Sequence, residues 1–329
     1  MHDSNRKGRH MEHLRNESLR NEYISRINKV QDYIETHLDE TFTLEKLAHI
    51  ANFSSYHFHK IFSSITHETL FQYIQRVRLE KAAMLLKTNP KEPIIQIAIR
   101  CGFANQASFA KAFKNYFNMT ASEFKAKIMK EKFEFNQNIK SNFGKVFKEG
   151  LCYNDIKIGE QSCIRALQED IPFSVEVKNM SEMEVAYIRH TGPFEQDARL
   201  FDELFTRLEA WARARVSYDS FYPKKLVITH DDPSLTSKMK LRVSVCMTVP
   251  KEIKAEGEVG RLTLLGGRYA VGHFELEPHQ YGQAWSLMYA KWLPQSGYEP
   301  DDRPSFELYP ECHQGGADGK EVVLICIPI

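Results

Sequence analysis

The sequence predicts two domains: an all-α bipartite helix-turn-helix domain, then an α+β domain of two pseudo-symmetric strand-helix-strand-strand units. Its 329 residues exceed the length of one average domain. A helix-turn-helix pattern occurs twice before residue 130, and strand alternation replaces helical periodicity after residue 171. We therefore expect a disordered N-terminus over 1–18, the helix-turn-helix domain over 19–130, a linker over 131–170 and the α+β domain over 171–329.

Charge is divided unevenly along the chain. The whole sequence has 44 Lys and Arg against 43 Asp and Glu. Residues 1–132 hold 21 basic and 14 acidic side chains, whereas residues 133–329 hold 23 and 29. Basic surfaces neutralise DNA phosphates. The half with the helix-turn-helix patterns is therefore the half suited to DNA.

The N-terminal half opens with an expected helix over 23–37 and then the first helix-turn-helix pattern. Leu47 and Ala48 are its apolar pair, and Asn52 marks the turn, because Asn enters the left-handed region more readily than other non-glycine residues. The pattern recurs fifty residues later, and beyond the turn the offset becomes fifty-one. The second turn is therefore expected to be one residue longer.

The second pattern runs from Ile94 to Phe117. Ile97 and Ala98 fit one face of a short helix, and Phe109 and Phe113 fit a second helix. Gly102 lies between them and can adopt the positive φ that a sharp turn needs. The polar side of the second helix carries residue types that contact base edges and phosphates.

A single long helix is expected to join the two copies, from Leu70 to Thr88. At about 1.5 Å per residue it would span roughly 28 Å. Successive major-groove faces on one side of B-DNA are ~34 Å apart, so such a rod can place two recognition helices in neighbouring grooves. Pro90 and Pro93 then end the helix.

The two helix-turn-helix patterns and the helix between them resemble the DNA-binding domain of the AraC/XylS family of bacterial transcription regulators, over about residues 20 to 128. The resemblance implies DNA contacts from two sets of three residues, which are Tyr56, His59 and Lys60, and Gln106, Ser108 and Lys111. The chain departs from the family at Asn52, where Gly is usual, and also at His59 and Ala107. These departures leave the operator sequence open. Two recognition helices in one chain would allow a monomer to read an asymmetric site.

Other features bound the class of protein. Six cysteines form no CxxC pair and have no histidine at zinc-ligand spacing, so we expect reduced thiols and no metal or cofactor. The N-terminus is charged and no run approaches eighteen apolar residues, which predicts a cytoplasmic protein with no membrane association. The GxSxG, HExxH, Walker A and strand-following GxGxxG patterns are absent from the sequence, so we expect no catalytic residues.

The C-terminal half is expected to form eight strands and two helices. The strands are expected at 174–177, 184–189, 226–230, 241–249, 261–265, 269–275, 305–309 and 321–327. The helices have apolar faces marked by Phe201 to Trp211 and by Tyr281 to Trp292. Two units of similar length predict a groove between two related halves.

This half resembles the GyrI-like effector-binding domain. The resemblance rests on HTGPFEQ (190–196), THDDPS (229–234), LRVSVCM (241–247), GGRYAVGHFE (266–275) and WLPQSGYEPDDRPSFELY (292–309). It implies a pocket for small, often cationic and aromatic molecules, with Glu307 as its central acid. Our candidates for the aromatic walls are Tyr187, Trp285, Tyr281 and Tyr269. Alternation places Phe306 and Leu308 on the opposite strand face from Glu307; without the resemblance, Glu307 would be read as an ordinary solvent-facing carboxylate.

The combination of domains resembles the Rob-type group of regulators. It implies double-stranded DNA, RNA polymerase and a small-molecule effector as partners, with activation as the family default and repression left open. One alternative is a GyrI-like small-molecule hydrolase that uses Glu307 as general base with a tyrosine. Where that tyrosine is sought, the chain has Ile228, Thr229 and His230. Another alternative is a C-terminal domain that binds a protein partner.

The run His230-Asp231-Asp232 suggests either a metal or catalytic site or a turn capped by Asp side chains before Pro233. We expect the turn, since Asp side chains often cap turns of this kind.

Overall fold

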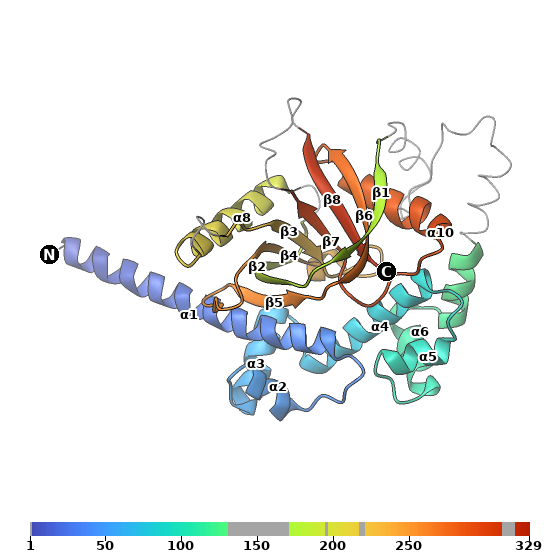
Figure 1. The fold of residues 1–329 in the computed structure, drawn as a ribbon. Coiled ribbons are helices and arrows are strands. Elements are labelled where there is room, and N and C mark those ends of the chain that lie inside the picture. Colours follow the sequence, from blue (N-terminus) through green and yellow to red (C-terminus); the bar gives the residue numbers. More distant parts are fainter. Residues whose placement is uncertain (1, 131–170, 195–196, 217–220, 311–319) are drawn as a thin grey trace.

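The computed structural model describes residues 2–130, 171–194, 197–216, 221–310 and 320–329, without the side chains of 2–18 and 290. The expected linker over 131–170 lies outside the described residues. Helices form the first part and a large sheet with flanking helices forms the second, and the two parts lie against each other (Figure 1). Within the described part, no helix is long and apolar enough to cross a membrane.

The helical part follows the predicted plan closely. Its elements are α1 His2–Thr36, α2 Leu44–Ile50, α3 Ser55–Thr66, α4 Leu70–Thr88, α5 Ile94–Arg100, α6 Gln106–Phe117 and a helix over 121–130. Most begin at a side-chain cap, and the α4 cap is a full capping box between Thr69 and Gln72. The first helix differs from expectation: it begins at His2, so 2–18 are helical rather than disordered. That stretch contains no proline, and its three Arg, one Lys and two Glu favour helix.

The two turns have the predicted conformations. Asn52 has φ +52° and Gly102 has φ +80°, both in the left-handed region. Residues 51–54 separate α2 from α3, and residues 101–105 separate α5 from α6. The second turn is one residue longer, as the change of offset predicts.

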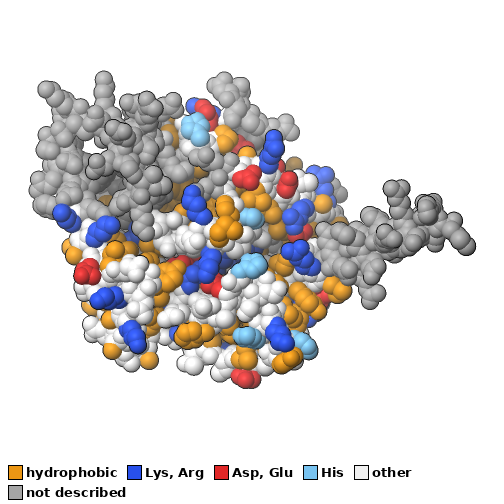
Figure 2. All heavy atoms as spheres, turned by 180° about the vertical axis from the view of Figure 1, so that it is seen from behind, with side chains coloured by type: hydrophobic (Ala, Val, Ile, Leu, Met, Phe, Trp, Pro, Cys, Tyr) orange, Lys and Arg blue, Asp and Glu red, His pale blue; other side chains and the backbone are white. Residues whose placement is uncertain are grey.

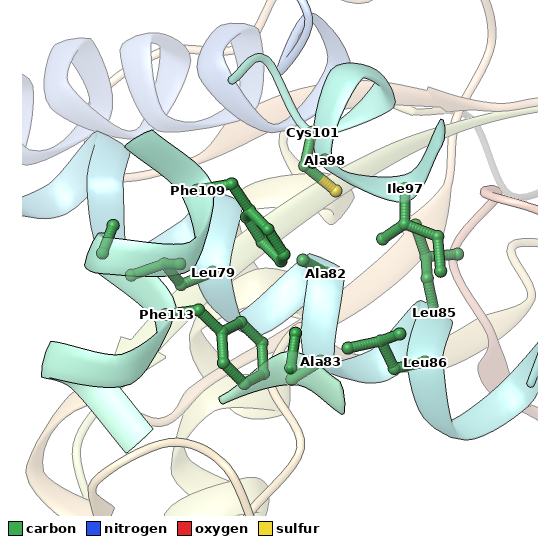
Figure 3. Packing of buried hydrophobic residues seen from close by; sticks show 12 residues of the cluster. Leu79, Ala82, Ala83, Leu85, Leu86, Ile97, Ala98, Cys101, Phe109 and Phe113 are labelled. Carbon is green, nitrogen blue, oxygen red and sulfur yellow. The ribbon is translucent and has the colours of Figure 1, made fainter. Parts of the chain in front are cut away.

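Helix α4 supports both helix-turn-helix units. Its first half contributes Tyr73 and Val77 to a core formed with α1, α2 and α3. Its second half contributes five residues, from Leu79 to Leu86, to a core formed with α5 and α6. In Figure 3, Phe109 and Phe113 of α6 point toward Ala82 and Ala83 of α4. Each unit is therefore packed on its own half of one continuous helix.

The C-terminal part contains one antiparallel sheet with the order β1-β6-β8-β7-β3-β4-β2-β5. Its strands are β1 Ser174–Met180, β2 Met183–Thr191, β3 Lys225–Thr229, β4 Arg242–Thr248, β5 Gly260–Leu264, β6 Gly267–Leu276, β7 Phe306–Tyr309 and β8 Glu321–Pro328. The order is symmetric about the β7–β3 pair. The first unit contains β1 to β4 and the second contains β5 to β8. The first strand of each unit pairs with the other unit, since β1 pairs with β6 and β5 pairs with β2. This arrangement is the predicted pair of related halves, but each half has two strands before its helix, where the predicted unit has one.

The helices of the C-terminal part cover one face of this sheet. Helix α8 Ala198–Arg213 packs on the β3–β4–β2 side. On the β6–β8 side lie α9 Tyr281–Ser286, the π turn η3 Leu287–Trp292 and α10 Leu293–Ser296. We expected one regular helix here. Pro294 has no amide hydrogen to donate to the preceding turn, which disfavours a regular α-helix there. The wider π turn ends two residues before this proline.

Candidate DNA-binding surface and effector site

The first candidate DNA-binding surface is the exposed face of α3. Ser54 caps this helix, because its hydroxyl accepts a hydrogen bond from the His57 amide. Tyr56 is 69% exposed, and Lys60 Nζ donates a 3.0 Å hydrogen bond to the Tyr56 hydroxyl while lying 4.5 Å from the ring centroid. His59 is exposed on the same helix. The arrangement offers a cation, an imidazole and a phenol to a partner.

The second surface is the exposed face of α6. Asn105 Oδ1 accepts a 2.8 Å hydrogen bond from the Ser108 amide, and the Ser108 hydroxyl donates back to the Asn105 carbonyl oxygen at 2.9 Å. Gln106 and Lys111 are exposed. Figure 2 shows Lys and Arg side chains spread over the lower, helical part of the molecule's back face, where Asp and Glu are sparse. All six predicted DNA-contact residues are thus open to solvent.

A contact between the two units fixes their relative position. Arg78 of α4 donates from Nε to the Leu38 carbonyl oxygen at 3.0 Å and from Nη2 to the Glu40 carbonyl oxygen at 2.6 Å. The Gly102 turn of the second unit lies directly against the same guanidinium. The segment after α1, the rod helix and the second turn therefore meet at one point.

The candidate effector site surrounds Glu307 on β7. This residue is 7% exposed and lies opposite Val227 of β3, beside the symmetry centre of the sheet. Trp285 Nε1 donates a 2.7 Å hydrogen bond to its Oε1, and the Tyr309 hydroxyl donates one of 2.8 Å to its Oε2. Burial raises the pKa of Glu307 more than these two donors lower it. Both donors are neutral, so the site holds a desolvated carboxylate beside aromatic rings.

The structure brings two of the four proposed wall aromatics to this site. Trp285 contacts Glu307 directly, and Tyr281 lies close by, with its hydroxyl donating to Glu321 at 2.9 Å. Tyr187 and Tyr269 lie instead on the opposite face of the sheet, packed with Phe306 and Leu308. The strand registers require this placement, because both tyrosines share a face with the residues that flank Glu307 in β7.

Sequence reasoning missed two aromatics of the site. Tyr309 donates to Glu307, and Tyr289 stacks on Trp285 with the ring centroids 5.9 Å apart. The signal for Tyr309 was present, since strand alternation places it on the Glu307 face. Tyr289 is four residues beyond Trp285, which is the spacing of neighbours on a helix face.

A buried ionic network joins the two domains on the other face of the sheet. Arg242 of β4 pairs with Asp231 and with Glu35 of α1, and donates a 2.7 Å hydrogen bond to the Tyr73 hydroxyl of α4. Burial alone would raise the pKa of Glu35, but Arg242 and His230 hold it well below its ordinary value. The network therefore holds the effector domain against α1 and α4 by paired, desolvated charges.

The neighbouring part of this interface explains why Tyr187 is buried on this face of the sheet. Its hydroxyl donates to Asp32 of α1, and Arg189 Nη2 donates to the same carboxylate at 2.6 Å. Burial, followed by the charge of Asp32, raises the pKa of Tyr187 well above its ordinary value. Tyr187 is therefore an interdomain contact in this structure.

The run His230-Asp231-Asp232 forms the expected turn, and Asp231 also takes part in the interdomain network. Asp232 Oδ1 accepts hydrogen bonds from the Ser234 amide at 2.8 Å and hydroxyl at 2.7 Å, whereas Asp231 is committed to Arg242. Among the described residues, no group of three His, Cys, Asp or Glu side chains is placed to hold a metal ion.

Two family models match the chain. Residues 173–329 match a GyrI-like small molecule binding domain, and residues 47–127 match a helix-turn-helix domain.

Individual proteins also resemble the N-terminal part. The multiple antibiotic resistance protein MarA of Escherichia coli is 31% identical over 118 residues, which are 36% of this chain and 92% of MarA. The regulatory protein SoxS of Salmonella typhimurium is 29% identical over 102 residues, 31% of this chain and 94% of SoxS. The crystal structure of an AraC-type regulator from Chromobacterium violaceum is 23% identical, covers 31% of this chain and 91% of its own, and gives a TM-score of 0.30.

Proposed function

Since this chain belongs to the AraC-type helix-turn-helix transcription regulators and carries a GyrI-like small-molecule-binding domain, we propose that it is an activator whose effector is a lipophilic aromatic cation. DNA binding and a small-molecule-binding domain follow from the family. The sign of regulation, the class of effector and the residues that contact each ligand are our proposal.

The observation that supports DNA binding is the pair of exposed faces on α3 and α6. These two helices pack on opposite halves of α4. Tyr56, His59 and Lys60 would contact one major groove, and Gln106, Ser108 and Lys111 would contact the next. The α4 rod of 19 residues supports a spacing of about one helical turn of DNA. A single chain would therefore read an asymmetric site.

The buried Glu307 carboxylate supports the cationic effector. Its two hydrogen-bond partners, Trp285 and Tyr309, carry no charge that could offset its ionisation. A cation with aromatic substituents would supply that charge and stack on the surrounding rings. Trp285 and Tyr281 are the wall residues that this site supports, and Tyr309 joins them.

We place the protein in the cytoplasm, with RNA polymerase as its partner at the promoter. A regulator of this family binds an operator on the bacterial chromosome, and the chromosome lies in the cytoplasm. SoxS, similar over 102 residues, is named a regulatory protein, which supports the same role for this chain. Ligand control requires that the occupied and empty effector domains differ in DNA affinity or in contacts with polymerase.

The test is selection of bound fragments from genomic DNA with the purified chain, followed by titration of the best site with and without tetraphenylphosphonium. We expect a discrete site about two helical turns long, and an affinity or in vitro transcript level that changes with the cation. Site-specific binding that no lipophilic cation alters would reject the effector class and leave DNA recognition standing.

A hydrolase is the second candidate. The Tyr309 hydroxyl lies 2.8 Å from a carboxyl whose pKa is raised, an arrangement in which the glutamate could act as a general base. Turnover of an electrophilic small molecule, abolished by Glu307→Gln, would support it. Binding of the same molecule without turnover would reject it.

A further inference from the structure

A chain of polar contacts runs along one side of α4, from the end of α3 to the end of α6. Its members are Glu68, two residues after α3, Arg76 and Glu80 of α4, and Tyr116, the penultimate residue of α6. Arg76 donates to Glu68 through Nη2 at 2.7 Å and through Nε at 3.2 Å. Its Nη1 donates to Glu80 Oε2 at 3.0 Å, and the Tyr116 hydroxyl donates to Glu80 Oε1 at 2.6 Å. This polar chain therefore joins the ends of both recognition helices.

The charged members of the polar chain are almost fully buried. The side chains of Glu68, Arg76 and Glu80 are 4%, 5% and 8% exposed. Breaking a link between them would leave desolvated charges without a partner, and the hydrogen bonds also favour one geometry. Apolar contacts have no such directional preference. The polar chain therefore resists small rotations of the helices that apolar packing alone would permit.

The effector domain contacts the same chain at Glu68. Lys240, in the connection between β3 and β4, donates from Nζ to Glu68 Oε2 at 2.8 Å. Arg76 makes three hydrogen bonds to this carboxylate, and Lys240 makes one. The polar chain is thus anchored within the helical domain, and the effector domain adds a further donor at its outer end.

A second contact between the two helix-turn-helix units lies on another side of α4. Arg78 donates to the carbonyl oxygens of Leu38 and Glu40 and lies against the Gly102 turn. Residues two positions apart are about 200° apart around an α-helix, so Arg76 and Arg78 act on different sides of α4. One contact would leave the second unit free to rotate about it. Two contacts on different sides fix its direction as well as its position.

The geometry of DNA makes this fixed direction important. One added base pair moves the second half-site by about 3.4 Å along the duplex and by ~34° around it. Two recognition helices that are held rigidly cannot follow that shift, whereas helices that rotate about α4 can. The residues that hold α6 to α4 therefore decide how strictly a spacing is read.

We propose that the polar chain fixes the separation and angle of α3 and α6, and thereby determines which spacing between two operator half-sites the protein accepts. Its members are positioning residues, because they act through the two helices rather than through contacts with bases. The inference rests on the proposed function, since it takes α3 and α6 as the helices that enter the DNA grooves.

The test compares binding to three forms of the operator obtained by genomic selection. One is the selected sequence, and the others have one base pair inserted or removed between the segments that α3 and α6 read. For the wild type we expect either change to weaken binding by about ten-fold or more. Tyr116→Phe removes one hydroxyl and keeps the ring, and here we expect the loss to shrink to about three-fold or less. The ratio of affinities is the readout, because a general loss of stability would weaken binding to all three forms alike.

Glu80→Gln breaks the same chain at another residue. Arg76 and Tyr116 donate to different oxygens of Glu80, and a glutamine amide offers only one oxygen. This variant should relax the spacing preference as Tyr116→Phe does. The double variant should relax it no further than the stronger single variant, because both changes break one chain. Urea unfolding verifies that each variant is folded under the binding conditions.

Tyr33→Phe is the matched control. It removes a tyrosine hydroxyl that donates to Glu40 at 2.9 Å, which is a contact within the first unit. It should keep the spacing preference of the wild type. An unchanged preference in Tyr116→Phe and Glu80→Gln, or an equal change in Tyr33→Phe, would overturn the inference and leave the proposed DNA contacts standing. A wild type that binds all three operators equally would reject the reading of two neighbouring grooves, and the inference with it.

Discussion

The Gly102 backbone lies against the guanidinium of Arg78, so that a side-chain carbon added at Gly102 would stand 2.6 Å from Arg78 Cζ. The Leu38 carbonyl oxygen, which accepts a hydrogen bond from Arg78, is adjacent as well. One glycine therefore serves both the second turn and the contact between the two helix-turn-helix units.

We expect Gly102→Ala to lower the free energy of unfolding by about 2 kcal/mol or more, because the positive φ disfavours a side chain and the space is occupied. Urea unfolding measures the change. Gly257→Ala is the matched control: Gly257 also has positive φ, at +69°, but no atom lies within 4 Å of the added carbon. It should cost about 1 kcal/mol, and equal losses would argue against the Arg78 contact.

Lys111 should contribute a phosphate contact. Replacement by Ala is expected to weaken binding to any operator sequence and to reduce the slope of log affinity against log salt by about 1. Titrations of one labelled operator at several salt concentrations measure both. Lys254→Ala, an exposed lysine of the effector domain, should leave slope and affinity unchanged. An unaltered slope in Lys111→Ala would place that side chain away from the DNA backbone.

The parts of this molecule that could be predicted from sequence are those set by local spacing. The turns at Asn52 and Gly102, the α4 bounds and the face of Glu307 all follow from residues less than thirty positions apart. Hydrophobic periodicity and turn chemistry act over that range.

The interdomain contacts could not be predicted in this way. Arg242 and Glu35 are 207 positions apart, and Tyr187 and Asp32 are 155 apart. In the sequence, Tyr187 is an aromatic residue in a strand, which fits a pocket wall as well as an interface. Its role depends on where α1 lies against the sheet, and no local pattern contains that information.

Cation binding at Glu307 should depend on pH. Burial raises the pKa of Glu307, so the carboxyl takes up its proton at a higher pH than an ordinary glutamate. Affinity for tetraphenylphosphonium should therefore fall as pH decreases through that raised pKa, because the neutral acid gives the cation no counter-charge. Fluorescence titration across pH measures this.

The matched variants for this prediction are Glu307→Gln and Glu275→Gln. The first should bind the cation weakly at every pH, whereas the second changes an exposed glutamate and should follow the wild type. Affinity independent of pH in the wild type would show that Glu307 does not supply the counter-charge.

Breaking the interdomain network should destabilise the chain. Arg242→Met leaves the buried Asp231 and the partly buried Glu35 without their main cation, which costs about 3–5 kcal/mol. Lys251→Met removes a surface ion pair with Glu182, in which the lysine is 70% exposed, and should cost less than about 1 kcal/mol. Urea unfolding of both variants gives the comparison, and similar costs would mean that the buried pairs do not hold the domains together.

The same network should make stability fall in acid. The pKa of Glu35 is held well below its ordinary value, so the unfolded chain takes up this proton at a higher pH than the folded chain does. Glu35 therefore stabilises the fold above the ordinary glutamate pKa, and this contribution is lost as pH falls toward the lowered value. In Arg242→Met the main cause of the lowering is absent, so the pH dependence of the unfolding free energy should become shallower. Unfolding curves between about pH 7 and pH 3 test this, and equal pH dependence in both proteins would assign the acid sensitivity to other carboxylates.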